Sequence, residues 1–163
     1  MALRKIREIG DELLLKRSKE VTKLSRRNKN LIEDMLDTMY ERDGLGLAAP
    51  QVGVLKRIIV LDVGEGAIIL INPLIVKEEG SQTGEEGCLS VPEKWGNVTR
   101  PEKVLVKALN QDMVEIELEG EGLLARALCH EIDHLDGKLY VDLVEDGLRD
   151  ISEKEEAENA ADA

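Results

Sequence analysis

The chain has 163 residues, a formal net charge of −12 and 42% hydrophobic residues, but only 2% aromatic residues and no phenylalanine. This length fits one domain, whose core must be filled by leucine, isoleucine and valine. The acidic balance argues against sequence-independent binding of nucleic acid, which needs a basic surface. Charges interrupt the apolar stretches, so we expect neither a membrane helix of about 20 residues nor a secretory signal. We therefore expect a cytoplasmic protein with no membrane partner and no direct nucleic-acid specificity.

Charge is distributed unevenly along the chain. Residues 1–29 hold ten lysines and arginines against four acids, whereas residues 142–163 hold nine acids against two bases. We interpret both segments as solvated surface. The sequence predicts a single domain over residues 1–150, followed by an acidic tail over residues 151–163 that is too polar to pack firmly.

The first half of the chain combines one amphipathic helix with extended segments. Ser25 is a good N-cap for a helix that runs to about Arg42, because apolar residues recur at helical spacing between them. The glycine-rich stretch Gly44–Gly53 predicts a loop. Two β-branched runs, Arg57–Val63 and Ala67–Ile71, are separated by glycines and predict a hairpin.

The second half predicts a further hairpin and a second helix. Residues 80–101 are rich in Gly, Ser, Thr and Pro, so we expect only short extended pieces there. Lys103–Leu109 and Met113–Leu118 predict the hairpin, and a helix from about Glu121 to Leu135 should end at Gly137. Helices at both ends with antiparallel strands between them indicate an α+β fold.

The second predicted helix carries the sequence His130-Glu131-Ile132-Asp133-His134, an H-E-x-x-H pattern that contains both histidines of the chain. Four residues rotate about 400°, so the two imidazoles project from one face, one turn apart, and can share a divalent ion. Glu131 lies about 100° round the helix, within reach of water at that ion. The pattern therefore predicts a metal site.

A catalytic site of this kind takes a third protein ligand and leaves one position for water. A third histidine six residues after His134 is excluded, because position 140 is Tyr. A glutamate of the acidic tail would have little apolar material to hold it still. Of the two cysteines, Cys129 should point away from the shared histidine face, which leaves Cys88 as the favoured ligand by elimination.

Three motifs together resemble the peptide deformylase family. They are Gly44-Leu45-Gly46-Leu47-Ala48-Ala49-Pro50-Gln51, then Glu86-Gly87-Cys88-Leu89-Ser90, then His130-Glu131-Ile132-Asp133-His134-Leu135-Asp136-Gly137. Their order and approximate spacing match the family's signature, and the family's size matches nearly the whole chain. The resemblance implies an α+β fold with antiparallel sheets packed around a central H-E-x-x-H helix, and one catalytic deformylase domain over residues 1–150.

The resemblance also implies a role for each motif residue. One divalent ion would be held by Cys88, His130 and His134: Fe(II) in the cell, with zinc, nickel or cobalt in its place as purified. Glu131 would be the general acid and base, and Gln51 with the backbone N–H of Leu89 would bind the oxyanion. The expected substrates are N-formylmethionyl peptides. Residues expected to align the peptide or line its methionine pocket are Leu45, Gly46, Gly87, Leu123 and Ala127.

Some positions depart from the family pattern or carry separate hypotheses. Cys129 replaces a common Gln, Trp95 replaces an Arg of some relatives, and Arg126 replaces an apolar pocket residue. Some relatives dock on the ribosome through a basic C-terminal helix, whereas this chain ends acidic, so any transient ribosome contact would use the basic N-terminal segment. Arg100 is a candidate partner of Glu86, and Asp133 a candidate second support of the site.

Two other functions compete with deformylation. A generic metallopeptidase could use the same helix, but it would cleave internal peptide bonds and need a third ligand other than Cys88. A non-enzymatic module would enclose its metal with four protein ligands and leave Glu131 without a role.

Overall fold

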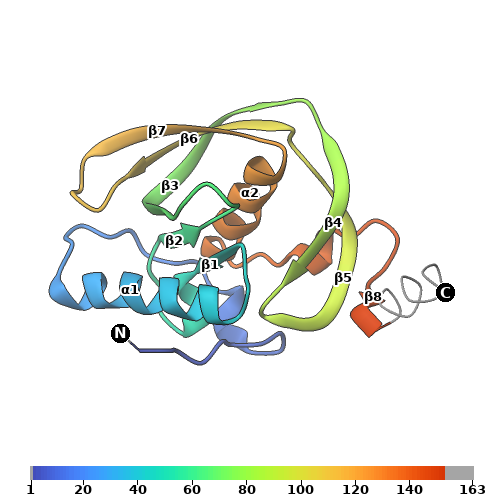
Figure 1. Ribbon diagram of the computed structural model, residues 1–163, viewed down its shortest axis with the longest axis horizontal. Helices are drawn as coiled ribbons and strands as arrows, with labels where there is room; N and C mark the ends of the chain where they lie inside the picture. Colours follow the sequence, from blue (N-terminus) through green and yellow to red (C-terminus); the bar gives the residue numbers. More distant parts are fainter. Residues whose placement is uncertain (1, 153–163) are drawn as a thin grey trace.

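The computed structural model describes residues 2–152, which form two antiparallel sheets and two α-helices (Figure 1). The expected tail therefore lies almost entirely outside the described residues. The helices are α1 (Arg26–Glu41) and α2 (Leu123–Leu135), and short 3₁₀ turns are η1 (Glu12–Leu15), η2 (Ala49–Val52) and η3 (Tyr140–Leu143). The strands are β1 (Gly46–Ala48), β2 (Ile58–Leu61), β3 (Ile68–Glu79), β4 (Gln82–Cys88), β5 (Val91–Arg100), β6 (Lys103–Leu109), β7 (Glu115–Glu121) and β8 (Arg149–Asp150).

The larger sheet has the order β1-β2-β3-β6-β7 and separates the two helices. Alternate residues of β2 face opposite sides: Ile58 and Val60 pack with α1, whereas Ile59 and Leu61 pack with α2. Both sides are therefore apolar, which explains why β2 is buried along its whole length. The smaller sheet, β4-β5-β8, lies on the other side of α2, so this helix runs between the two sheets (Figure 1).

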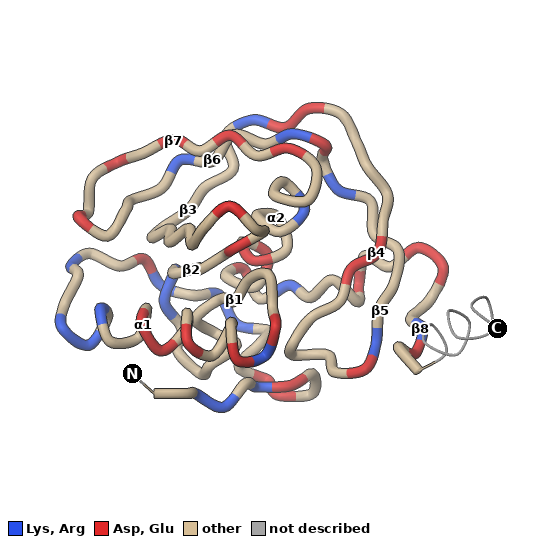
Figure 2. The backbone as a smooth tube through the Cα atoms, viewed as in Figure 1, with Lys and Arg blue, Asp and Glu red and all other residues tan. Residues whose placement is uncertain are grey.

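The edge strand β7 carries a row of exposed glutamates, at positions 115, 117, 119 and 121. Lysines on the neighbouring strand β6 pair with them: Lys103 with Glu119 and Glu121, and Lys107 with Glu115 and Glu117. Figure 2 marks the acidic positions along β7 in red and the basic positions of the neighbouring β6 in blue. The charges are exposed, so each pair contributes little to stability.

The α+β prediction is confirmed, as are the Ser25 N-cap, whose side chain accepts from the Asn28 N–H, and the two predicted hairpins. Several predicted boundaries are wrong. Gly46–Ala48 is a strand rather than loop, because it pairs with β2. Residues 80–101 form two long paired strands instead of short pieces.

Two element boundaries differ from the predicted ones because a residue with a positive φ turns the chain there. The second hairpin's return strand begins at Glu115, not Met113, since Met113 has a φ of 59° in the turn. The strand then continues through Glu121, and α2 starts only at Leu123, because Gly122 turns the chain with a φ of 58°. Gly137, at a φ of 74°, follows the end of α2 as predicted. Among the described residues, no helix is long and apolar enough to cross a bilayer.

Candidate metal centre

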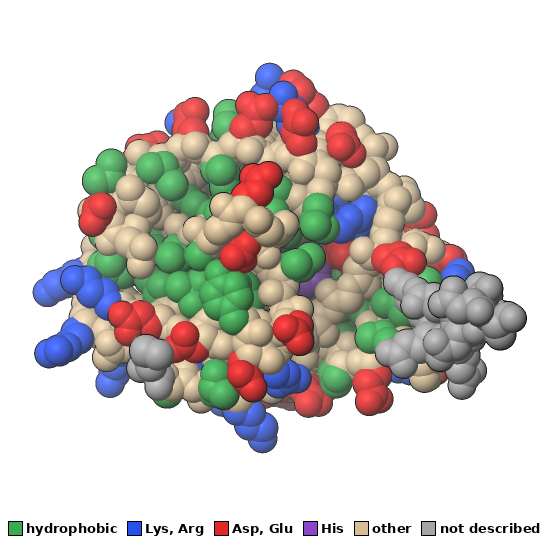
Figure 3. Space-filling view, in the orientation of Figure 1, with side chains coloured by type: hydrophobic (Ala, Val, Ile, Leu, Met, Phe, Trp, Pro, Cys, Tyr) green, Lys and Arg blue, Asp and Glu red, His purple; other side chains and the backbone are tan. Residues whose placement is uncertain are grey.

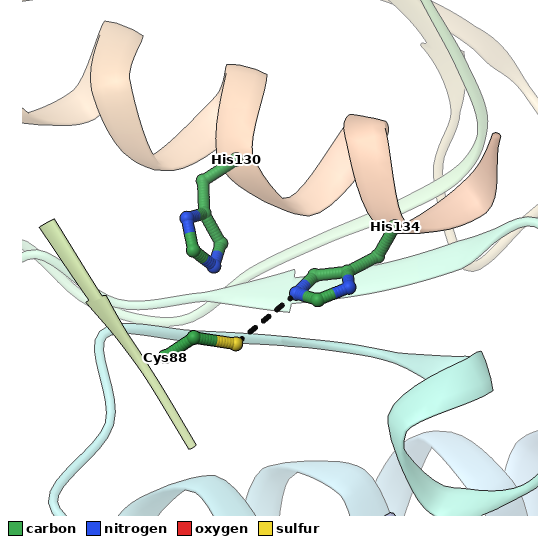
Figure 4. Close-up of side chains that lie close together, drawn as sticks. All are labelled: Cys88, His130 and His134. Carbon is green, nitrogen blue, oxygen red and sulfur yellow. Dashed lines mark hydrogen bonds between the residues drawn. The ribbon is translucent and has the colours of Figure 1, made fainter. Parts of the chain in front are cut away.

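Cys88 and the two histidines converge at one point between β4 and α2 (Figure 4). Cys88 ends β4, and His130 and His134 project from one face of α2, as their spacing predicts. One ligand atom from each residue lies within 4.8 Å of the others, and Cys88 Sγ lies 3.3 Å from His134 Nε2. Sulfur and nitrogen bound tetrahedrally to one ion such as zinc would be about 3.6 Å apart. The three side chains therefore fit a shared divalent ion.

A buried carboxylate orients the first histidine. His130 Nδ1 lies 2.6 Å from Glu86 Oε1, so its N–H donates there and Nε2 is left to bind an ion. Arg100 donates two hydrogen bonds to Glu86, at 2.9 and 2.8 Å, and a third to Asp133 at 2.7 Å. The predicted pairing of Arg100 with Glu86 is confirmed, and Asp133 joins it.

The charges around the histidines favour a cation. Burial opposes ionisation of Glu86, but hydrogen bonds from Arg100 and His130 lower its pKa to about 2. Burial likewise opposes protonation of His130, yet Glu131, Cys88 and Glu86 raise its pKa well above the usual value. Burial lowers the pKa of His134 well below the usual value, so its ring is neutral. Negative groups around one imidazole and a neutral second imidazole suit a divalent ion.

Glu131 lies beside this centre with little access to solvent. It is 4% exposed, and burial raises the pKa of its carboxyl to about 7. Its Oε1 has no hydrogen-bond partner among residues 2–152. Gly46 of β1 packs directly against the same carboxyl group, because a Cβ there would lie 2.6 Å from Glu131 Oε2. Glu131 is thus a confined carboxyl group, one oxygen of which has no hydrogen-bond partner in the described part of the chain.

The Gln51 side chain is fixed by hydrogen bonds to both its amide oxygen and its amide nitrogen. Its Oε1 accepts from the Ala48 N–H at 2.9 Å, which directs Nε2 toward Ser90 Oγ at 3.0 Å and Cys88 Sγ at 3.4 Å. The N-terminal segment supports this arrangement, since Arg7 N–H donates to Gln51 O and Ile9 N–H to Ser90 O, both at 2.7 Å. A preorganised N–H donor therefore faces the centre.

A cleft of about 440 Å³ opens onto the site, and histidine is visible at its base in Figure 3. Leu45 and Leu123 stand at its rim, 47% and 50% exposed, whereas Ala127 is buried in its wall. The sequence-predicted site residues that line this cleft are Leu45, Gly46, Gln51, Gly87, Cys88, Leu89, Leu123, Ala127, His130 and Glu131. His134 is not part of the lining and is buried.

The structure also places residues whose contacts sequence reasoning missed. Arg126 donates to Glu86 Oε2 at 2.7 Å, and the Tyr140 ring lies 5.8 Å from that of His130. The period-two pattern of a strand could have indicated that Glu86 shares a face with Cys88. Cys129 packs in the core, as expected from its angle, and burial raises its pKa to about 11. Trp95 lies outside the cleft lining and stacks with Arg149.

A helix that presents two histidines and a glutamate beside a strand cysteine defines a metal-dependent hydrolase. The model of the polypeptide deformylase family matches residues 3–149. The chain therefore belongs to the polypeptide deformylase family of metal-dependent enzymes.

Relatives of known name agree with this assignment. The chain is 59% identical to a peptide deformylase of Agathobacter rectalis over 93% of this chain and 96% of the relative. It is 61% identical to a peptide deformylase of Caldicellulosiruptor bescii over 95% of this chain and 92% of that relative. Among solved structures, the Legionella pneumophila peptide deformylase matches with a TM-score of 0.86 at 48% identity, covering 89% of this chain and 88% of that one. The Thermotoga maritima peptide deformylase matches with a TM-score of 0.87 at 44% sequence identity. The match covers 89% of this chain and 99% of that one.

Proposed function

We propose that the chain hydrolyses the N-formyl group of formyl-methionine on newly synthesised polypeptides, releasing formate and a free amino terminus. Membership in the deformylase family supports this reaction. The observation that carries it is the buried Oε1 of Glu131, which has no hydrogen-bond partner within residues 2–152 and lies beside three converging ligand atoms next to a cleft. A structural metal module would have no use for such a carboxylate.

Cys88, His130 and His134 are the proposed ligands of one divalent ion, since thiolate and imidazole together suit several first-row metals. Such an ion would act as a Lewis acid and lower the pKa of a water molecule bound to it toward neutrality. We propose Fe(II) in the cell, with zinc, nickel or cobalt able to take its place in purified protein.

Glu131 is the proposed general base and then general acid. Its free Oε1 accepts the proton of the attacking water, and the same carboxyl later delivers that proton to the departing amine nitrogen. Burial favours the return of the proton, because it raises the pKa of this carboxyl above its ordinary value and so makes the protonated form more accessible.

Gln51 and the backbone N–H of Leu89 are the proposed donors to the oxyanion that forms when the formyl carbonyl is attacked. The Gln51 amide is suited to this role because its Oε1 is held by the Ala48 N–H, so its Nε2 cannot turn away without breaking a bond. Fixed donors of this kind stabilise developing charge without reorganisation.

The cleft supplies the proposed binding surface for the peptide. Leu45, Leu123 and Ala127 are apolar lining residues suited to a methionine side chain. Backbone at Gly46 in β1 and Gly87 in β4 would align the peptide from two sides, since both belong to strands that border the cleft. We further propose that the enzyme acts in the cytoplasm and meets the ribosome only transiently, through its basic N-terminal segment.

A formate-release assay tests the function directly. Formyl-Met-Ala-Ser should lose its formyl group, with no cleavage of internal bonds, and Glu131→Gln should retain its metal while losing turnover. Cleavage of internal bonds would support a metallopeptidase instead. A protein that unfolds on chelation and behaves identically after Glu131→Gln would support a structural metal module.

A further inference from the structure

Arg126 connects α2 to the β4–β5 hairpin. Its side chain starts on the helix, is 7% exposed, and reaches acceptors on both strands. Nη1 donates to Glu86 Oε2 at 2.7 Å and to the Val98 carbonyl at 2.9 Å, and Nη2 lies 3.5 Å from the Gln82 carbonyl. β4 leaves room for the guanidinium at Gly84, where a Cβ would lie 3.3 Å from Nη2.

Arg126 also balances the charge of a largely buried cluster, which we call the Glu86 cluster and which consists of Glu86, Asp133, Arg100 and Arg126. Two carboxylates meet two guanidiniums, so the charges of these four side chains cancel. Loss of Arg126 would remove one of the two guanidiniums that compensate the buried carboxylate of Glu86, and a poorly compensated buried charge is costly.

The hydrogen bonds to Glu86 are divided evenly between its two oxygens. Oε1 accepts from Arg100 and His130, and Oε2 accepts from Arg100 and Arg126. Loss of Arg126 would leave Oε2 with one donor, and the carboxylate would then be held only by Arg100 and His130. The orientation of the His130 ring would be less firmly fixed, because its Nδ1–H is held by Oε1 alone among the described residues.

We propose that Arg126 is a positioning residue of the metal centre, acting through Glu86. It fixes the carboxylate that orients His130, and it sets the spacing between the helix that carries both histidines and the hairpin that carries Cys88. This inference rests on the proposed function, because it takes these three residues as the ligands.

Co(II) affinity of the purified protein, measured by competition with a chelator, tests the proposal without relying on turnover. Arg126→Met keeps the stem and removes the guanidinium, and we expect its dissociation constant for Co(II) to rise between about 10- and 100-fold. The thiolate-to-cobalt absorption band should also shift or weaken. Arg149→Met is the matched control, since Arg149 is an exposed arginine that contacts Asp146 and Trp95 outside the cleft. Wild-type affinity and spectrum in Arg126→Met would overturn the proposal.

A double-mutant cycle separates positioning from general structural support. If Arg126 acts through Glu86, then Arg126→Met should change Co(II) affinity by less than about 2-fold when Glu86 is already Gln. Fully additive losses would contradict the proposed route. If Arg126→Met does not fold, Arg126→Lys decides, because an ammonium cannot reach all three acceptors: weaker Co(II) binding in the folded lysine variant supports the proposal, and unchanged binding refutes it. A wild type that binds Co(II) but releases no formate would contradict the proposed function alone.

Discussion

Gly46 and Glu131 lie so close that position 46 has no room for a side chain: a Cβ there would stand 2.6 Å from Oε2 and 2.9 Å from Cδ of Glu131. Gly46→Ala should therefore push the carboxyl out of place while leaving the strand intact, since Gly46 does not have a positive φ. We expect kcat to fall about 100-fold, the effect of misplacing a catalytic group by about 1 Å. Metal content and Tm should stay near wild type, and an unchanged kcat would show that Glu131 tolerates displacement.

Gln51→Leu should lower kcat on the order of 100-fold, because it removes the amide donor that faces Cys88. Formate release by metal-saturated protein measures this loss. Ser90→Ala is the comparison, since it removes only the acceptor of one Gln51 N–H and leaves the amide in place. Equal losses in both variants would mean that Gln51 acts through packing of this loop rather than as a donor.

Gly137→Ala should destabilise the fold for two reasons that a second variant separates. Position 137 has a φ of 74°, and a Cβ there would lie 2.4 Å from the Leu15 carbonyl oxygen. We expect the free energy of unfolding to fall by more than about 2 kcal/mol in a urea titration, since the left-handed conformation alone costs about 1–2 kcal/mol. Gly147→Ala carries a φ of 83° with no atom within 4 Å, so it should show the backbone cost alone. An equal loss of unfolding free energy in both variants would mean that the contact with the Leu15 carbonyl does not contribute.

Asp34 should make stability depend on pH. Burial would raise the pKa of Asp34, but hydrogen bonds from the Ala2 N–H and Arg4 outweigh it and hold the pKa below its usual value. A carboxyl whose pKa is lower in the folded than in the unfolded protein stabilises the folded state at pH values above its unfolded pKa, which is about 3.9 for Asp. This contribution is lost as the pH falls through the folded-state pKa. Asp34→Asn should therefore be less stable than wild type at pH 7, and the difference should shrink in acid.

Urea titrations between pH 7 and pH 2 measure the Asp34 effect. Asp37→Asn is the matched control on the same helix, because no hydrogen bond or ion pair of the Asp37 side chain occurs within residues 2–152. A stability difference that grows as pH falls would contradict the assigned direction of the Asp34 pKa.

The sequence predicted the parts of the site that depend on local geometry. The four-residue spacing of His130 and His134 requires that both rings share a helix face, and the structure has them there. Cys88 was favoured only by elimination and by family resemblance, because contact between β4 and α2 depends on how the hairpin folds over the helix. No local spacing rule contains that information.

In the rest of the fold, too, elements set by local spacing were predicted, whereas those that depend on long-range pairing were not. Apolar residues at helical spacing marked α1, but only short extended pieces were expected where β4 and β5 run, because their Gly and charged residues have low intrinsic strand preference. Those strands form through pairing along a seven-residue register, Gln82–Cys88 against β5. The links of Arg126 to Glu86 and Val98 depend on that pairing, so they could not be predicted before it.

The glutamates along β7 bear on how copies of this protein meet. A free sheet edge offers unpaired N–H and C=O groups that can accept a strand from another molecule. Here a second copy approaching edge to edge would set one row of carboxylates against an identical row, and their mutual repulsion opposes docking. The outermost strand thereby discourages self-aggregation of a sheet whose opposite side must remain apolar to pack against α2.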